Sequence, residues 1–183
     1  MPPLNFLMID GKGNPNTSQA YQDAIETLFP VSYALKFASK KTLGKDYVVP
    51  PLEGLWWGTP KGQTRFSATD KALWSWTSLM MVPDFISAEM VLETIASVKE
   101  SKQPPAIDKV RFETLEEGLS VQIMHIGPFE DEGPTAENMH AFAAEQGYTL
   151  TGKHHEIYLS DFRKVDPAKN KVVLRHPIKP AAP

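Results

Sequence analysis

The segment HHEIYLSD, residues 154–161, places a carboxylate beside a phenol. Alternate side chains of a strand point to the same face, so Glu156 and Tyr158 share a face with His154, while Ile157 points to the other. Most strand glutamates are solvated. A carboxylate among aromatic side chains is partly desolvated, which raises its pKa and suits it to act as a general base or as a counter-charge for a cation. We therefore take Glu156 and Tyr158 as catalytic candidates.

The aromatic residues suggest a surface for a flat ligand. The four tryptophans fall in two pairs, Trp56–Trp57 and Trp74–Trp76. A core accounts for any single one of them, but as a group they exceed what a core of this size needs, which favours at least two lining a ligand surface. Trp57 lies in the same predicted strand as Glu53, and Trp74 and Trp76 share a face of theirs.

The five histidines raise the question of a metal site. No two of them have the helical spacing of a metal-binding pair, and the adjacent His154 and His155 point to opposite faces of a strand. His125 and His154 can meet across a sheet. On balance the sequence predicts no metal and no cofactor, and we keep His154 as a ligand-binding candidate.

The segment GYTLTGKH, residues 147–154, matches a phosphate-binding loop except at its last position. His154 stands where a hydroxyl would hold magnesium, and the segment runs from a helix into a strand, the reverse of the required order. We interpret it as a helix stop followed by a loop.

Composition excludes several classes of protein. The chain of 183 residues has a net charge of −3, no basic run and no cysteine. It therefore lacks the electrostatic footprint of a nucleic-acid-binding protein, and it has neither disulfides nor a cysteine nucleophile. The segment MPPLNFLMID is no signal peptide, and no run approaches the roughly 20 apolar residues of a membrane span. We expect a cytoplasmic protein without nucleic-acid or membrane partners, and the sequence identifies no protein partner.

Apolar spacing indicates the elements that position these residues. NFLMID is a strand candidate, and the apolar residues from Tyr21 to Phe29 have helical spacing. Pro30 interrupts that stripe, which predicts a kinked or two-piece helix. Strands follow at YVVPPLEGLWWG and ALWSWTSLMMVP, and Ser87 is the expected N-cap of a second helix. KVRFETL-EEG-LSVQIMHIG predicts a hairpin, and a third helix, stopped by Gly147, leads to HHEIYLSD and NKVVLRHPI.

The two halves of the chain share one order of elements. FLMIDGKGNP matches QIMHIGPFED, and superposing PLEGLWW on HHEIYLS puts Glu53 opposite Glu156 and Leu55 opposite Tyr158. We predict one α+β domain over residues 1–183, with two pseudo-symmetric βαββ repeats, about 4–83 and 108–178, joined by a helix at about 87–102. The sheet is expected to be antiparallel, with helices on one face and an aromatic ligand cleft on the other. Symmetry makes Glu53 and Leu55 ligand-binding candidates.

Four segments, VVPPLEGLWWG, WSWTSLMMVPDFI, VQIMHIGPFEDE and HHEIYLSD, together resemble the GyrI-like small-molecule-binding domains over essentially the whole chain. The likeness is greater to the stand-alone branch that includes cyclopropanoid cyclopropyl hydrolases than to the effector-binding halves of drug-sensing regulators. The chain starts almost directly at NFLMID, whereas that branch commonly has a segment before the first strand, and no helix-turn-helix signature precedes the domain. By this resemblance Glu156 is the family's cleft glutamate and Tyr158 its neighbouring aromatic residue. The resemblance also makes Trp57, Trp76 and Phe129 candidates for binding the ligand.

The resemblance implies a cleft for a planar aromatic or cationic small molecule, and it leaves two functions open. In one, Glu156 helps to activate water that opens the strained ring of a cyclopropanoid toxin, a detoxification reaction. In the other, the protein binds or senses planar aromatic cations without chemistry. The same carboxylate and aromatic side chains serve both functions. A third interpretation is a protein-interaction module.

Overall fold

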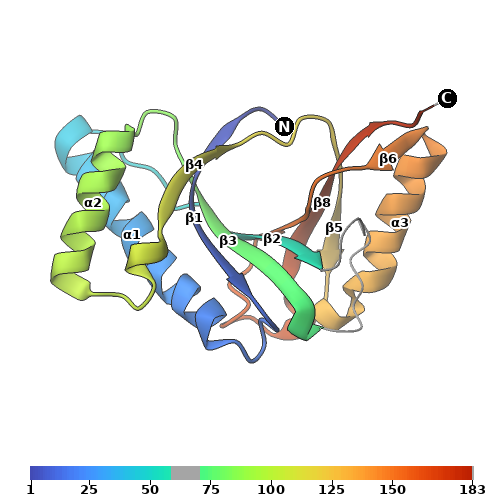
Figure 1. The fold of residues 1–183 in the computed structure, drawn as a ribbon, viewed down its shortest axis with the longest axis horizontal. Helices are drawn as coiled ribbons and strands as arrows, with labels where there is room; N and C mark the ends of the chain where they lie inside the picture. The colour runs from blue at the N-terminus through green and yellow to red at the C-terminus, as the bar shows by residue number, and fades with distance from the viewer. Residues whose placement is uncertain (59–70, 183) are drawn as a thin grey trace.

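The computed structural model describes residues 1–58 and 71–182, whose strands form a single antiparallel sheet (Figure 1). The order of its strands is β4-β1-β3-β2-β7-β8-β5, with β6 paired to β8. The strands are β1 (Leu4–Lys12), β2 (Leu52–Gly58), β3 (Trp74–Val82), β4 (Arg111–Leu115), β5 (Ser120–Ile126), β6 (Tyr148–Leu150), β7 (His154–Tyr158) and β8 (Lys171–Pro180). The α-helices are α1 (Gln19–Leu43), α2 (Ala88–Lys102) and α3 (Glu132–Glu145).

The sheet contains two repeats of the order βαββ, the second of which has the additional short strand β6. The first repeat supplies the neighbours β1-β3-β2 and the second supplies β7-β8-β5, so the strand order of one repeat is reversed in the other. The repeats meet where β2 pairs with β7, with Trp56 opposite His154. The predicted α+β fold of two pseudo-symmetric repeats with an antiparallel sheet is confirmed.

Strands β4 and β5 do not form the predicted hairpin. Strand β4 pairs with β1 at one edge of the sheet, and β5 pairs with β8 at the opposite end. The glycine-containing turn between the two strands shows that the chain changes direction, but it does not determine that the strands pair with each other. Strand β4 finds its partner at the open edge of β1, where Phe112 and Leu115 pack against buried residues of the sheet.

Helix α1 is continuous from Gln19 to Leu43, so the two-piece alternative is wrong. Ser18 accepts a hydrogen bond from the backbone N–H of Tyr21 and caps the helix. The buried stripe continues on both sides of Pro30, with Leu28 before it and Leu35 after it. Burial of this stripe against β1 and β3 offsets the hydrogen bond that proline cannot make.

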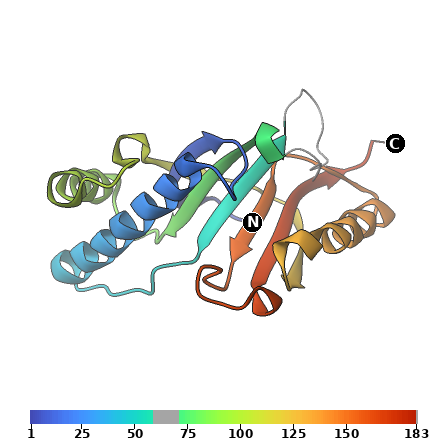
Figure 2. The ribbon, with the colours of Figure 1, turned by 90° about the horizontal axis from the view of Figure 1, so that it is seen from below.

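Helices α1 and α3 lie on the same side of the sheet, with β2 and β7 between them (Figure 2). Helix α3 packs on β5 and β6, while α2 packs on α1. Ser87 caps α2, and Gly147, at a φ of 80°, follows α3, both as predicted. Within the two described ranges no helix has the length and apolar character that a bilayer crossing requires.

Candidate functional site

The large aromatic side chains gather on the face of the sheet that carries the helices. Trp56, Trp76 and Tyr158 belong to the same buried cluster as Tyr21 of α1. The ring of Tyr21 lies 5.0 Å from Trp76 and 5.6 Å from Trp56, measured between centroids. The expectation that the aromatic residues line the face away from the helices is therefore wrong for Trp76 and Tyr158, whereas Trp57 does lie on that other face, in a cluster with Leu55. Helices α1 and α3 stand apart on this face, on either side of the central strands β2 and β7.

Glu156 is buried in this aromatic cluster with an exposed fraction of only 7%. The hydroxyl of Tyr158 donates to Glu156 Oε2 over 2.6 Å, and the indole N–H of Trp56 donates to the Tyr158 oxygen over 3.2 Å. Burial and then the Glu156 carboxylate raise the pKa of Tyr158 well above its usual value. The phenol therefore stays protonated and keeps the carboxylate in a fixed position.

Gly54 makes room for this arrangement. It lies directly opposite Glu156 in the pairing of β2 with β7. A Cβ atom at Gly54 would lie 2.7 Å from Trp56 Nε1 and 3.0 Å from the Tyr158 oxygen. A glycine inside a strand often marks such a close approach, so Gly54 is a signal for the site that can be found in the sequence without the structure.

Glu132, the first residue of α3, is a second carboxyl group of the site, and no sequence pattern singled it out. Burial and then the nearby Glu156 carboxylate raise its pKa to about 9, so Glu132 is protonated at neutral pH. It can therefore donate a proton where Glu156 accepts one. An acidic residue at a helix N-terminus is so common that its position alone carries no functional signal.

A pocket of about 370 Å³ opens beside Tyr158, within the size range of small-molecule sites. Helix α1 and the segments 49–52 and 158–163 line it. Phe129 and Phe162 meet Tyr158 edge-on, with ring centroids 5.8 Å and 5.4 Å from its own. The predicted ligand-binding residue Phe129 is thus in the same group as Tyr158. Trp76 is also in this group but is fully buried, so it supports the site from beneath rather than forming an open wall.

The structure does not bring Glu53, Leu55 and Trp57 to this site. Strand β2 pairs Gly54, not Glu53, with Glu156. Glu53 pairs instead with Ile157, the neighbour of Glu156 in β7, and therefore points to the other face of the sheet. Leu55 packs in a cluster with Leu79. The ammonium nitrogen of Lys153 lies over the Trp57 ring, 3.5 Å from its centroid.

Glu53 belongs instead to a buried ion network on the opposite face. His155 lies between two glutamates: its Nε2 atom is 2.8 Å from Glu53 Oε2 and its Nδ1 atom is 2.9 Å from Glu117 Oε1. The other oxygen of Glu117, Oε2, is 3.0 Å from Nη1 of Arg175. Burial alone lowers the pKa of His155, but hydrogen bonds to the two carboxylates outweigh burial and raise it. Burial alone raises the pKa of Glu117, but His155 and Arg175 outweigh burial and lower it. In this network each carboxylate therefore has a basic side chain as its partner.

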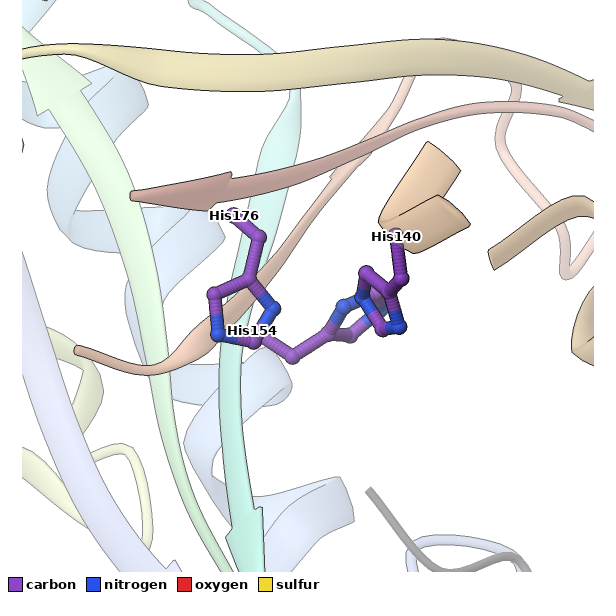
Figure 3. A group of neighbouring side chains, drawn as sticks. All are labelled: His140, His154 and His176. Carbon is purple, nitrogen blue, oxygen red and sulfur yellow. The ribbon is translucent and has the colours of Figure 1, made fainter. Parts of the chain in front are cut away.

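His154 joins the candidate site to a group of three histidines (Figure 3). Its Nε2 atom lies 3.4 Å from Glu156 Oε1. His140 from α3 and His176 from β8 complete the group, and one ring nitrogen of each residue lies within 4.8 Å of the others. The predicted partner, His125, contacts Thr135 and the Pro128 carbonyl instead. Burial, then the neighbouring His154, lowers the pKa of His176 to about 3, so this ring is neutral.

Residues 1–179 match the model of the GyrI-like small-molecule-binding domain. The chain belongs to the GyrI-like family. No curated protein sequence matches it. The GyrI-like chain is 41% identical to an uncharacterised conserved protein from Listeria innocua, with a TM-score of 0.87 over 97% of this chain and 89% of that one. It is 38% identical to a protein from Listeria innocua described as a hydrolase, with a TM-score of 0.83 over 97% and 88% of the two chains.

The C-terminal domain of EcmrR shares only the fold with this GyrI-like domain. The two are 12% identical, with a TM-score of 0.57 over 99% of this chain and 94% of that domain.

Proposed function

We propose that this GyrI-like domain is a hydrolase that opens the cyclopropane ring of planar, electrophilic cyclopropanoid compounds and so detoxifies them. The observation that carries the proposal is the buried Glu156 carboxylate, held by the Tyr158 hydroxyl among aromatic rings. A carboxylate held in this way can accept a proton, and the aromatic rings around it suit a flat, largely apolar substrate. The description of a relative with 38% identity as a hydrolase supports the same reaction type.

The proposed reaction adds one water molecule to a cyclopropane that is conjugated with a ketone. Glu156 accepts a proton from water as the water oxygen bonds to the ring methylene. The breaking carbon–carbon bond sends its electron pair into the conjugated system, and the carbonyl oxygen takes up a proton and becomes a hydroxyl. Glu132, protonated at neutral pH, is the proposed source of that proton, and Tyr158 orients the water or the carbonyl.

The substrate is proposed to enter through the pocket beside Tyr158. Phe162 lines this pocket and its ring contacts that of Phe129, and the Arg163 guanidinium lies 4.7 Å from the ring of Phe29. In this proposal both repeats act as one domain, because Glu132 and Glu156 come from the second repeat while Trp56 and Tyr21 come from the first.

Incubation with a spirocyclopropyl dienone tests the proposal, with mass spectrometry to detect a product heavier by one water. Turnover by wild-type protein should saturate with substrate. It should fall as the pH rises through about 9, since Glu132 then loses its proton. Glu132→Gln should be slower at neutral pH and should lack this alkaline decline. Product formation no faster than in buffer would contradict the hydrolase.

A second function, binding of planar aromatic cations without chemistry, is favoured by the charge around Glu156. Its contacts are a phenol and His154, and the ion pairs of the described residues include no lysine or arginine at this carboxylate. A cationic ring system would supply the counter-charge and stack on the aromatic residues.

Tryptophan fluorescence separates the two functions. A planar cation that binds beside Tyr158 should quench the emission of Trp56, which contacts that residue. For a binding protein, Glu156→Gln weakens the affinity for cations and leaves the affinity for neutral planar compounds unchanged. An unchanged affinity for both kinds of ligand contradicts the cation site.

A further inference from the structure

The three histidines of Figure 3 come from separate elements and converge on one point. His140 projects from α3, His154 from β7 and His176 from β8. The ring of His176 lies 5.3 Å from that of His140 and 6.0 Å from that of His154, measured between centroids. Neither the general-base chemistry of Glu156 nor the aromatic pocket accounts for this convergence.

We propose that His140, His154 and His176 form a binding site for a divalent transition metal, and that zinc is the ion that fits it best. Neutral imidazole nitrogens are preferred ligands of zinc, and three of them leave a fourth tetrahedral position for water. Zinc–nitrogen bonds of about 2.0–2.1 Å put the nitrogens roughly 3.4 Å apart. Small rotations of the rings close the present spacing, in which the nitrogens lie within 4.8 Å of one another.

The burial of His176 points to a ligand. Its side chain is only 1% exposed, and neither ring nitrogen has a hydrogen-bond partner among the described residues. A buried polar group without a partner costs about 1–3 kcal/mol, so residues of this kind are rare unless they serve a function. A metal ion bound at one nitrogen would remove part of that cost.

Glu156 contacts one of the three histidines and can hold its ring in place. Its Oε1 atom lies 3.4 Å from Nε2 of His154, and in the proposed site the other nitrogen of that ring, Nδ1, binds the metal. Metal-binding histidines usually have a carboxylate or carbonyl on the nitrogen that does not bind the metal, because this contact fixes the ring and its tautomer. The proposed metal would tie α3 to the sheet next to the Glu156 carboxylate.

Titration calorimetry of tag-free protein with zinc chloride tests the site without any substrate. We expect one zinc ion per chain, and cobalt should give the visible absorption of a tetrahedral site with nitrogen ligands. His140→Ala and His176→Ala should each weaken zinc binding by more than the roughly 10–100-fold that loss of a supporting partner costs. Glu156→Gln, which removes such a partner, should weaken it by roughly 10–100-fold.

His125→Ala is the matched control, because His125 is also buried but lies outside the group. Zinc should raise the melting temperature of wild-type protein and of His125→Ala but not that of His140→Ala. If His176→Ala does not fold, His140→Ala still decides, because a half-buried helical position tolerates alanine. Absence of zinc binding to wild-type protein, or equal binding to His140→Ala, overturns the proposal.

Discussion

Both faces of strand β7 bury carboxylates, but the two faces differ in the partners that these carboxylates have. On one face Glu53 and Glu117 are matched by His155 and Arg175. On the other face Glu156 has the Tyr158 hydroxyl and His154 as its contacts, and burial beside it keeps Glu132 protonated. Removing one partner of a matched buried ion pair is destabilising, whereas a buried carboxylate without a lysine or arginine partner among the described residues is available to a substrate or a ligand. We therefore expect substitutions on the first face to affect stability and substitutions on the second to affect the proposed reaction.

Substitution of one glutamate on each face should separate these roles most strongly. Glu156→Gln is nearly isosteric but removes the charge and the base, so turnover of a spirocyclopropyl substrate should fall by about 10²–10⁴-fold. Glu53→Gln should leave turnover per folded molecule within about a factor of three, because Glu53 faces away from the pocket. Steady-state kinetics at matched folded concentrations measures both. Similar losses in the two variants would refute the division between the faces.

The matched face should respond in stability. Glu117→Gln removes the carboxylate that pairs with both His155 and Arg175, and we expect the free energy of unfolding to fall by about 2–3 kcal/mol. Glu116→Gln, at the exposed neighbouring position, is the control and should change little. Urea denaturation of the two variants gives the difference. If both variants are as stable as wild-type protein, the network does not stabilise the fold.

Acid should remove part of the same stabilisation. The folded-state pKa of Glu117 lies below the value of 4.5 expected for the unfolded chain. Its contribution is therefore fully present above pH 4.5 and is lost as the pH falls through the lower, folded-state pKa. The gap in unfolding free energy between wild-type protein and Glu117→Gln should narrow over that range. A gap that stays constant from neutral to acidic pH would show that Glu117 is not the group responsible.

Breaking an exposed ion pair should have the smallest effect on the free energy of unfolding, and it gives a reference for the effect of breaking the buried network. Lys99 of α2 pairs with Asp108 at 2.5 Å, but both side chains are more than half exposed. Lys99→Ala should change the free energy of unfolding by about 0.5 kcal/mol or less and leave turnover unchanged. Thermal and urea unfolding check this value. A loss as large as that of Glu117→Gln would mean that burial is not what distinguishes the network.

Local patterns in the sequence predicted the strand that carries Glu156 and Tyr158, because a period of two fixes which residues share a face. They did not predict which face the helices cover, since that depends on how the repeats join. The error at Glu53 has the same origin: similar letters in two strands do not fix the pairing register. Glu132 and the histidine group depend on packing between α3 and the sheet, to which no local pattern refers.

Strand β4 has a consequence for how the chain folds. The register pairs Leu4 with Leu115, so the outer edge of the first repeat is covered by residues that follow the connecting helix α2. The backbone N–H of Gly118 also donates to the Met1 carbonyl beside this edge. During synthesis the edge of β1 therefore stays unpaired until residue 115 has left the ribosome, and an exposed strand edge is a template for aggregation. A fragment that ends after β3 keeps that edge open permanently, so the first repeat depends on a piece of chain that lies beyond it.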